Sequence, residues 1–220
     1  MHKYKICVFL FLIIGIISFN YTYAHNNVLP LLGKIIYIDP GHGGLDPGTV
    51  YKDIYEKDIN LSISKKIEDS LTRQGAIVYM TRYGDYDLSA NNTINRKRSD
   101  LSRRSNIINR SNCDLYLSIH LNAETSSTWR GGQIFYDDIN EENKKIAEIF
   151  QKLFKEKLNS NRKYKKVTDL YLQKRVKVPG ILIEVGFLSN PNDRYLLKQD
   201  SYQSRVADVI TEATIQYLIS

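Results

Sequence analysis

Cysteine is scarce in this sequence, since only Cys7 and Cys113 occur among its 220 residues. Cys7 lies inside an apolar N-terminal run, so a chain that lost this run would keep Cys113 alone and could form no intramolecular disulfide. That run, Ile6–Phe19, is shorter than the roughly 20 residues that a membrane-spanning helix needs. The sequence also has no internal repeat, no low-complexity stretch and no glycine-rich loop of the P-loop type. We therefore expect one domain that relies on its hydrophobic core, or on a bound metal, for stability.

The N-terminus has the three parts of a secretory signal peptide. A short positive region at residues 2–5 precedes the apolar run, and Thr22 and Ala24 provide small residues for a signal peptidase. We expect cleavage after Ala24 and export of the remaining chain, with an uncleaved signal anchor as the alternative. The expected organisation is a signal peptide at 1–24, a short linker at 25–32 and a globular domain at 33–220.

Basic residues outnumber acidic ones. The formal charge of +7 includes Lys3 and Lys5 of the expected signal peptide, so the exported chain carries +5. The remaining basic side chains cluster at Arg96–Arg98, Arg103–Arg104, Arg162–Lys166 and Lys174–Lys177. Such clusters can bind nucleic acid, but an exported protein rarely meets it. We therefore expect no nucleic-acid partner and interpret the clusters as solvated faces or as contacts with anionic polymers of the cell surface.

Beyond residue 30, apolar runs typical of strands alternate with amphipathic stretches typical of helices. In the stretch 56–72, for example, Ile59, Ile63 and Ile67 recur at helical spacing. The expected strands are 34–38, 76–80, 114–119, 132–136, 170–172 and 181–185, and the expected helices are 56–72, 100–109, 140–158 with Asn140 as its cap, and 201–218. This alternation predicts a single α/β domain with a largely parallel central sheet and helices on both faces. In such sheets, ligands bind at the carboxyl ends of the strands.

Two histidines follow strands of this expected sheet. Of the four histidines, His2 belongs to the signal peptide and His25 would begin the exported chain, so only His42 and His120 lie within the globular domain. Each comes directly after the carboxyl end of an expected strand, so the two side chains should approach each other. Because imidazole is the commonest metal ligand, the pair indicates a metal site. The turn 39–44 holds three glycines around His42, which permit close backbone approach; an ordinary strand-to-helix turn is the alternative.

Two glutamates complete the candidate site. Glu56 opens the helix after this turn and can act as a third ligand, because catalytic zinc usually has three protein ligands and a carboxylate is often one of them. The alternative is a first-turn carboxylate that the helix dipole favours. Glu184 interrupts an apolar strand, where a carboxylate is unfavourable without partners and burial raises its pKa. We interpret Glu184 as a general base and acid beside the metal, with a glutamate at an exposed strand end as the alternative.

Four motifs occur in a fixed order along the chain: DPGHGG with DPG at 39–48, EKDINL at 56–61, SIHLN at 118–122, and Pro179 followed by IEVGFLSN at 183–190. In these motifs, and from about Lys34 to Leu218, the sequence resembles the zinc-dependent N-acetylmuramoyl-L-alanine amidases of the amidase-3 family. It departs from the family pattern at Thr49, Leu121 and Gly180, where smaller residues or alanine are common. These departures affect no reacting group, so they bear on substrate preference.

The resemblance implies one zinc ion held by His42, Glu56 and His120, with Glu184 as the catalytic glutamate. The implied reaction is hydrolysis of the amide between the lactyl group of N-acetylmuramic acid and L-alanine in peptidoglycan. Zinc would polarise the amide carbonyl and acidify a water molecule, and Glu184 would transfer the proton to the leaving amine. Asn122 is a candidate substrate contact at the glycan–peptide junction, or else a turn-forming asparagine.

Within the family, the chain looks like the short CwlD-type amidases of the spore cortex, which remove peptide from muramic acid before muramic-δ-lactam forms. This subgroup implies an extracytoplasmic location, in the cell wall or in the forespore intermembrane space. It also suggests a lipoprotein activator as a partner.

Two other functions would use similar residues. A zinc peptidase acting on the stem peptide needs the same metal chemistry, and the ligands alone do not separate it from an amidase. A non-catalytic wall-binding module with structural zinc is the other alternative. Structural zinc sites are usually closed by four ligands, mostly cysteine and histidine, and Cys113 is the single cysteine left after signal cleavage.

Overall fold

The computed structural model of the chain describes residues 29–91 and 93–220. The chain divides into two units, Met1–Pro30 and Leu31–Ser220, and the second contains all the elements described below. The expected signal peptide at 1–24 and residues 25–28 of the expected linker lie outside the described residues. Among the described residues, no helix combines the length and apolar character needed to cross a membrane.

Six strands form one sheet in the order β4-β1-β5-β8-β6-β7. Their bounds are β1 Ile35–Pro40, β4 Ile77–Met80, β5 Leu115–Asn122, β6 Gln133–Tyr136, β7 Lys165–Lys166 and β8 Gly180–Phe187. The four strands β4, β1, β5 and β8 are parallel, whereas β6 is antiparallel to β8 and carries β7 at the edge. The prediction of a largely parallel sheet is confirmed. A separate hairpin, β2 (Val50–Tyr51) and β3 (Ile54–Tyr55), precedes the first described helix.

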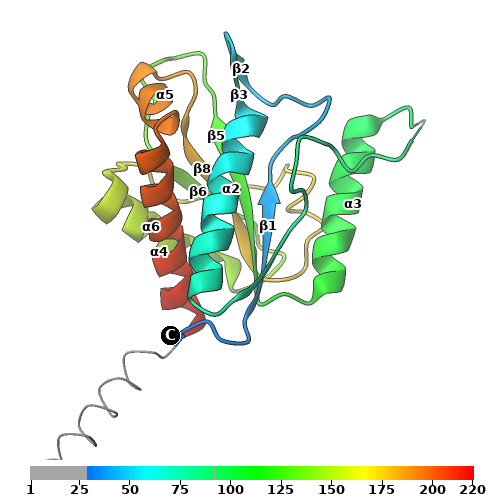
Figure 1. Cartoon of the computed structure of the whole chain (residues 1–220), viewed down its shortest axis with the longest axis vertical. Helices are drawn as coiled ribbons and strands as arrows, with labels where there is room; N and C mark the ends of the chain where they lie inside the picture. Colours follow the sequence, from blue (N-terminus) through cyan, green and yellow to red (C-terminus); the bar gives the residue numbers. More distant parts are fainter. Residues whose placement is uncertain (1–28, 92) are drawn as a thin grey trace, which may run out of the picture. The chain divides into compact units, whose positions relative to one another are not determined.

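Helices cover both faces of the sheet, as predicted. They are α2 Glu56–Arg73, α3 Arg96–Ser111, α4 Asn143–Leu158, α5 Pro191–Leu197 and α6 Asp200–Leu218. The side-chain alternation of β1 explains the two layers, because Ile36 and Ile38 point to one face and Tyr37 to the other. The first face packs against α2, α4 and α6, with α2 and α6 side by side (Figure 1). Tyr37 packs with Ile108 of α3 on the opposite face.

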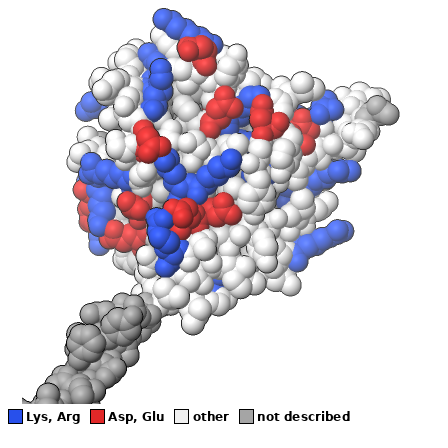
Figure 2. All heavy atoms as spheres, in the orientation of Figure 1, with Lys and Arg blue, Asp and Glu red and all other residues white. Residues whose placement is uncertain are grey.

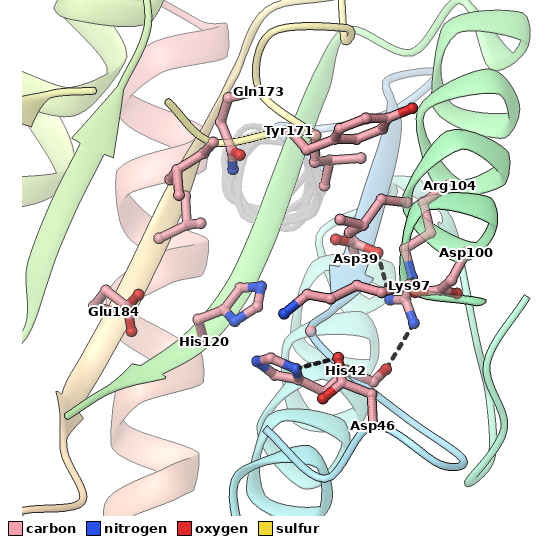
Figure 3. A pocket seen from close by; sticks show the side chains of 15 residues that line it. Asp39, His42, Asp46, Lys97, Asp100, Arg104, His120, Tyr171, Gln173 and Glu184 are labelled. Carbon is pink, nitrogen blue, oxygen red and sulfur yellow. Dashed lines mark hydrogen bonds and ion pairs between the residues drawn. The ribbon is translucent and has the colours of Figure 1, made fainter. Parts of the chain in front are cut away.

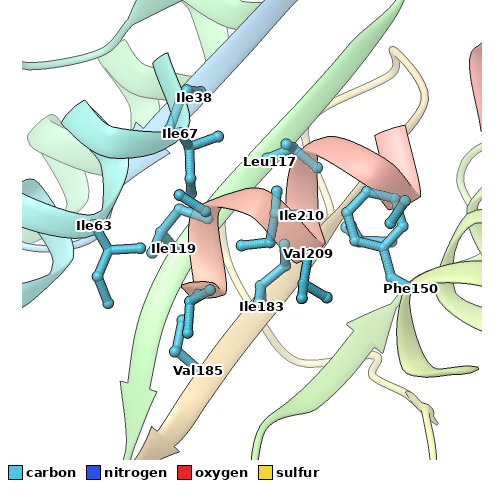
Figure 4. Packing of buried hydrophobic residues seen from close by; sticks show 14 of the residues in the cluster. Ile38, Ile63, Ile67, Leu117, Ile119, Phe150, Ile183, Val185, Val209 and Ile210 are labelled. Carbon is cyan, nitrogen blue, oxygen red and sulfur yellow. The ribbon is translucent and has the colours of Figure 1, made fainter. Parts of the chain in front are cut away.

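The larger core lies between the sheet and the α2–α4–α6 layer. Figure 4 shows Ile63 and Ile67 of α2 and Ile210 of α6 converging on Leu117 and Ile119 of β5, and all five side chains are fully buried. Burial of one such side chain contributes about 1.5–3 kcal/mol to stability. This packing holds α2 against β5. Because α2 begins at Glu56, the packing also fixes the position of that candidate ligand.

Charged side chains on the α2–α6 face are of both signs and partly paired (Figure 2). Lys66 of α2 contacts Asp200 of α6 at 2.6 Å, and Lys157 of α4 contacts Glu212 of α6 at 2.5 Å. Exposed pairs of this kind contribute only about 0–1 kcal/mol each. The hydrophobic core, rather than these surface pairs, therefore holds the helices in place.

Several local predictions differ from the structure. Helix α4 begins at Asn143, and Asn140 lies before it, where its side chain accepts a hydrogen bond from the Glu142 N–H in a local turn. The prediction of a strand at 170–172 is wrong, because this segment enters a helical turn instead. Helix α5 and the β2–β3 hairpin are too short to produce a recognisable period in the sequence.

Buried Arg104 joins α3 to the carboxyl end of β1. Its guanidinium lies 2.9 Å from the carboxylates of both Asp39 and Asp100, and it donates to the backbone carbonyls of Pro40 and His42. The sequence places Arg104 in a basic cluster that we interpret as a solvated face. In the structure its side chain is 1% exposed, because two carboxylates compensate its charge.

Replacing Arg104 with alanine should lower the free energy of unfolding by about 3–5 kcal/mol, because Asp39 and Asp100 would be left buried without their cation. Denaturant unfolding followed by circular dichroism measures the change. Arg103→Ala, at an exposed position of the same helix, is the matched control and should change stability by less than about 0.5 kcal/mol. Equal losses in the two variants would show that the buried pair has no special role.

Candidate metal centre

The carboxyl ends of β1 and β5 bring the two histidines together. These strands are parallel neighbours, with Pro40 opposite Ile119. His42 follows Pro40 by two residues, and His120 follows Ile119 directly within β5. The two imidazole rings meet edge to face, with their centroids 4.9 Å apart. The expected approach of His42 and His120 is confirmed.

Two glycines make room for the side chains of this site. A Cβ atom on Gly41 would lie 2.2 Å from the His120 ring. Gly48 has a φ of +66°, and a Cβ there would lie 2.7 Å from both His42 Cδ2 and Glu56 Oε2. A larger residue at either position would displace one of these side chains. His42 itself has a φ of 62°, a conformation that is uncommon outside glycine and is often found at functional sites.

Glu56 lies between the two imidazoles. It is the first residue of α2 and is 3% exposed. Its Oε1 is 3.2 Å from His42 Nε2 and 3.0 Å from His120 Nδ1. The backbone N–H groups of Thr49 and Leu121 donate to its two oxygens at 2.8 and 3.0 Å. These contacts hold the carboxylate at the point where the histidines converge.

The same contacts shift the pKa values of the site. Burial alone would raise the pKa of Glu56, but its hydrogen bonds with His120 and His42 hold that pKa far below the usual range of a carboxyl group. Burial would likewise lower the pKa of His42, yet its contacts with Asp46 and Glu56 raise it to about 9. The carboxylates of this site therefore stabilise a positive charge placed between them, as the binding site of a cation must.

The three side chains fit a single metal ion. One ligand atom from each of His42, Glu56 and His120 lies within 4.8 Å of the others. Two imidazoles and one carboxylate are a common ligand set of catalytic zinc. His42 Nδ1 lies 2.9 Å from Asp46 Oδ2, and a carboxylate on the second ring nitrogen is the usual way to orient a metal-binding histidine. The Gly48 N–H in turn donates to Asp46.

Glu184 lies on β8 directly opposite His120 of β5 (Figure 3). Its Oε2 is buried and has no hydrogen-bond partner among the residues that the structure describes. Burial, reinforced by the negative charge of Glu56 and opposed by His42, raises the pKa of Glu184 to about 8. The apolar strand thus places a carboxyl group with a raised pKa next to the candidate ligands.

Comparison with known protein families agrees with this geometry. The family model Amidase_3, described as N-acetylmuramoyl-L-alanine amidase, matches residues 36–216. The chain belongs to this amidase family. It is a hydrolase of peptidoglycan, and this membership favours the amidase reaction over the stem-peptide peptidase and the non-catalytic module.

Individual relatives match the amidase over most of its length. The germination-specific N-acetylmuramoyl-L-alanine amidase of Bacillus subtilis is 44% identical over 214 residues, which cover 93% of this chain and 90% of the relative. The structure of the CwlD amidase from Clostridioides difficile in complex with the GerS lipoprotein has a TM-score of 0.81 and 36% identity, covering 84% of this chain and 98% of that one. An N-acetylmuramoyl-L-alanine amidase from Clostridium difficile 630 has a TM-score of 0.77 and 31% identity, covering 85% and 97%.

The open side of the metal centre is a cavity of about 380 Å³. The three candidate ligands, Glu184 and Asn122 are among the residues that line it. Asn122 is the last residue of β5, and its backbone carbonyl accepts a hydrogen bond from the Leu188 N–H. Its position beside the ligands is compatible with the predicted substrate contact of the amidase.

The sequence did not indicate that two further residues, Asp46 and Lys97, lie at the metal centre. Asp46 contacts His42 and lies four residues after it, in the second DPG segment, so its position in that motif could have indicated the contact. Lys97 of α3 lines the cavity beside His42 and His120. No spacing in the sequence relates Lys97 to these histidines, because the position of α3 over the sheet brings them together.

Replacing Asp46 with asparagine should weaken Zn²⁺ binding by about 10- to 100-fold, because the second nitrogen of His42 loses its carboxylate partner. Competition with a chelator of known affinity measures the change. Asp53→Asn, at an exposed position between β2 and β3, is the control and should bind Zn²⁺ like the wild type. An unchanged affinity in the Asp46 variant would remove this residue from the metal centre.

Proposed function

We propose that this amidase holds one zinc ion with His42, Glu56 and His120 and uses Glu184 as general base and general acid. The observation that carries the proposal is the location of Glu184 beside the His–Glu–His cluster, with a buried Oε2 that has no partner among the described residues. A carboxyl group with a raised pKa next to metal ligands is typical of a hydrolytic active site. The mixed imidazole and carboxylate ligand set supports zinc.

Each residue has a distinct role in the proposed reaction. When bound, zinc would polarise the carbonyl of the scissile amide and acidify a water molecule. The Glu184 carboxylate accepts a proton from the attacking water and then donates it to the amine of the leaving L-alanine. Its raised pKa suits both steps, because a group with a pKa near the working pH exchanges a proton in either direction. Asn122, which lines the open cavity, contacts the glycan–peptide junction.

We further propose that the substrate is the peptidoglycan of the spore cortex and that the reaction precedes formation of muramic-δ-lactam. The support is the 44% identity to a germination-specific amidase and the likeness to the CwlD structure, each over most of both chains. This substrate requires an extracytoplasmic enzyme, in the cell wall or the forespore intermembrane space. The predicted signal peptide would provide its export.

In the presence of the lipoprotein activator proposed below, replacing Glu184 with glutamine should lower the release of intact stem peptides from purified peptidoglycan by about 10²- to 10⁴-fold, the usual contribution of a general acid–base group. Mass spectrometry of the digest measures the release and also identifies the bond that is cut. The variant should keep its zinc, since Glu184 is not a proposed ligand. Glu156→Gln, an exposed change on α4, serves as the control. Undiminished release by the Glu184 variant, or wild-type cleavage within the stem peptide, would refute the proposal.

A lipoprotein activator is a separate part of the proposal, supported by the complex of the Clostridioides difficile relative with the GerS lipoprotein. The purified amidase alone should bind zinc weakly and release little peptide, and the corresponding lipoprotein of its own species should restore both. Calorimetry with Zn²⁺ and the digestion assay measure the two effects, with an unrelated lipoprotein domain as the control. Tight zinc binding and full activity of the isolated chain would rule out a required activator.

A further inference from the structure

A second cavity, of about 260 Å³, extends from the metal centre toward α3. His42, His120 and Glu184 line its near end, and residues 170–173 cover its far end (Figure 3). Pockets that enclose a whole drug-sized ligand usually measure about 300–1,000 Å³. This cavity is smaller, so it suits one substituent of a larger substrate bound at the metal centre.

The segment that covers the far end is firmly held. Residues 170–176 form a helical turn with backbone hydrogen bonds. The Asn109 side chain of α3 donates to the carbonyl of Arg175 at 2.7 Å and accepts from the N–H of Lys177 at 2.8 Å. Leu172 is 4% exposed and belongs to the smaller core on this face of the sheet. A fixed backbone therefore presents the side chains of this segment to the cavity.

The amide of Gln173 is buried in this cavity without a partner. The residue is 2% exposed, and its Nε2 has no hydrogen-bond acceptor in the part of the chain that the structure describes. Figure 3 shows the amide pointing into the space between Tyr171 and His120. Buried donors without acceptors are rare in native proteins because they destabilise the fold. An acceptor on a bound ligand would satisfy this donor.

The far end of the cavity suits a neutral group. The leucines that line the cavity are Leu101, Leu170, Leu172 and Leu182. The guanidinium of Arg104 is already paired with Asp39 and Asp100. Lys97 lies at the end of the cavity next to the metal centre, because it also lines the open cavity and reaches toward His120 (Figure 3). A ligand carboxylate at the far end would therefore meet no unpaired cation among the described residues, whereas an uncharged acyl amide would find both a donor and apolar contacts.

We propose that this cavity binds the 2-acetamido group of the muramic acid whose lactyl amide is hydrolysed, and that Gln173 determines specificity for it. The inference rests on the proposed function. In muramic acid the acetamido group is attached to the carbon next to the one that carries the lactyl ether, so it lies close to the scissile amide. Its carbonyl accepts a hydrogen bond from Gln173 Nε2, and its methyl group contacts the leucine side chains. The alanyl residue offers the same acyl-amide chemistry, and the experiment separates the two.

Hydrolysis of N-acetylmuramoyl-L-alanyl-D-isoglutamine and of its de-N-acetylated analogue tests the inference, with the wild type beside Gln173→Met. Methionine keeps the size of the side chain but lacks the amide. The substitution should lower kcat/KM for the acetylated substrate by roughly ten- to a hundredfold, mainly through KM, because a buried hydrogen bond is lost. It should leave hydrolysis of the de-N-acetylated substrate nearly unchanged. Gln216→Met, exposed on α6, is the control and should affect neither substrate.

An equal loss of kcat/KM with both substrates would overturn the inference. A third substrate, the N-acetylmuramoyl ethylamide, keeps the methyl group of the alanyl residue but lacks its carbonyl, and so tests the peptide as the occupant. If the effect of Gln173→Met vanishes with this substrate and persists with the de-N-acetylated one, the cavity binds the alanyl residue instead, and the inference is also overturned.

Binding of N-acetylmuramic acid, which has no scissile amide, gives a readout that does not depend on hydrolysis. Saturation-transfer NMR should show strong transfer to the acetyl methyl group with the wild type and little with Gln173→Met, whose fold is checked by thermal unfolding. Absence of this transfer with the wild type would overturn the inference even in an active amidase. If the wild type, loaded with zinc and supplied with the lipoprotein activator, hydrolyses none of the substrates, the proposed function fails and the NMR result still decides the inference.

Discussion

The carboxylate of Glu56 lies within hydrogen-bond distance of His42 and His120 and accepts bonds from the backbone N–H groups of Thr49 and Leu121. These contacts join the first turn of α2 to the carboxyl ends of β1 and β5. A carboxylate buried in this way requires compensating positive charge, which comes either from protonated imidazole or from a bound cation. The glycine-rich turn leaves room for the side chains that meet there, and Glu184 lies beside them, across from His120.

The sequence was sufficient to predict the parts of the site that depend on strand ends. His42 and His120 each follow a β-branched or apolar run, and adjacent parallel strands bring such residues to one edge. Glu184 was recognisable because a single carboxylate interrupts an otherwise apolar strand. The helix that begins at Glu56 was predicted correctly from its period of isoleucines, which face the core.

Other features depend on tertiary contacts that leave no local pattern. Arg104 lies in a run of basic residues, and only its pairing with Asp39, 65 residues away, accounts for its burial. The segment 170–172 has the apolar character of a strand, yet its packing on α3 makes it the cover of a cavity and buries Gln173. Asn140 has the preference of a helix cap, but its side chain forms a local turn before α4 begins.

Binding of one metal ion by His42, Glu56 and His120 is tested most directly by anomalous X-ray diffraction at the zinc edge from crystals of the zinc-loaded protein. We predict a single strong peak about 2.0–2.2 Å from a nitrogen of each histidine and from an oxygen of Glu56. A peak bound by other residues, or no peak at this edge of the sheet, would contradict the account.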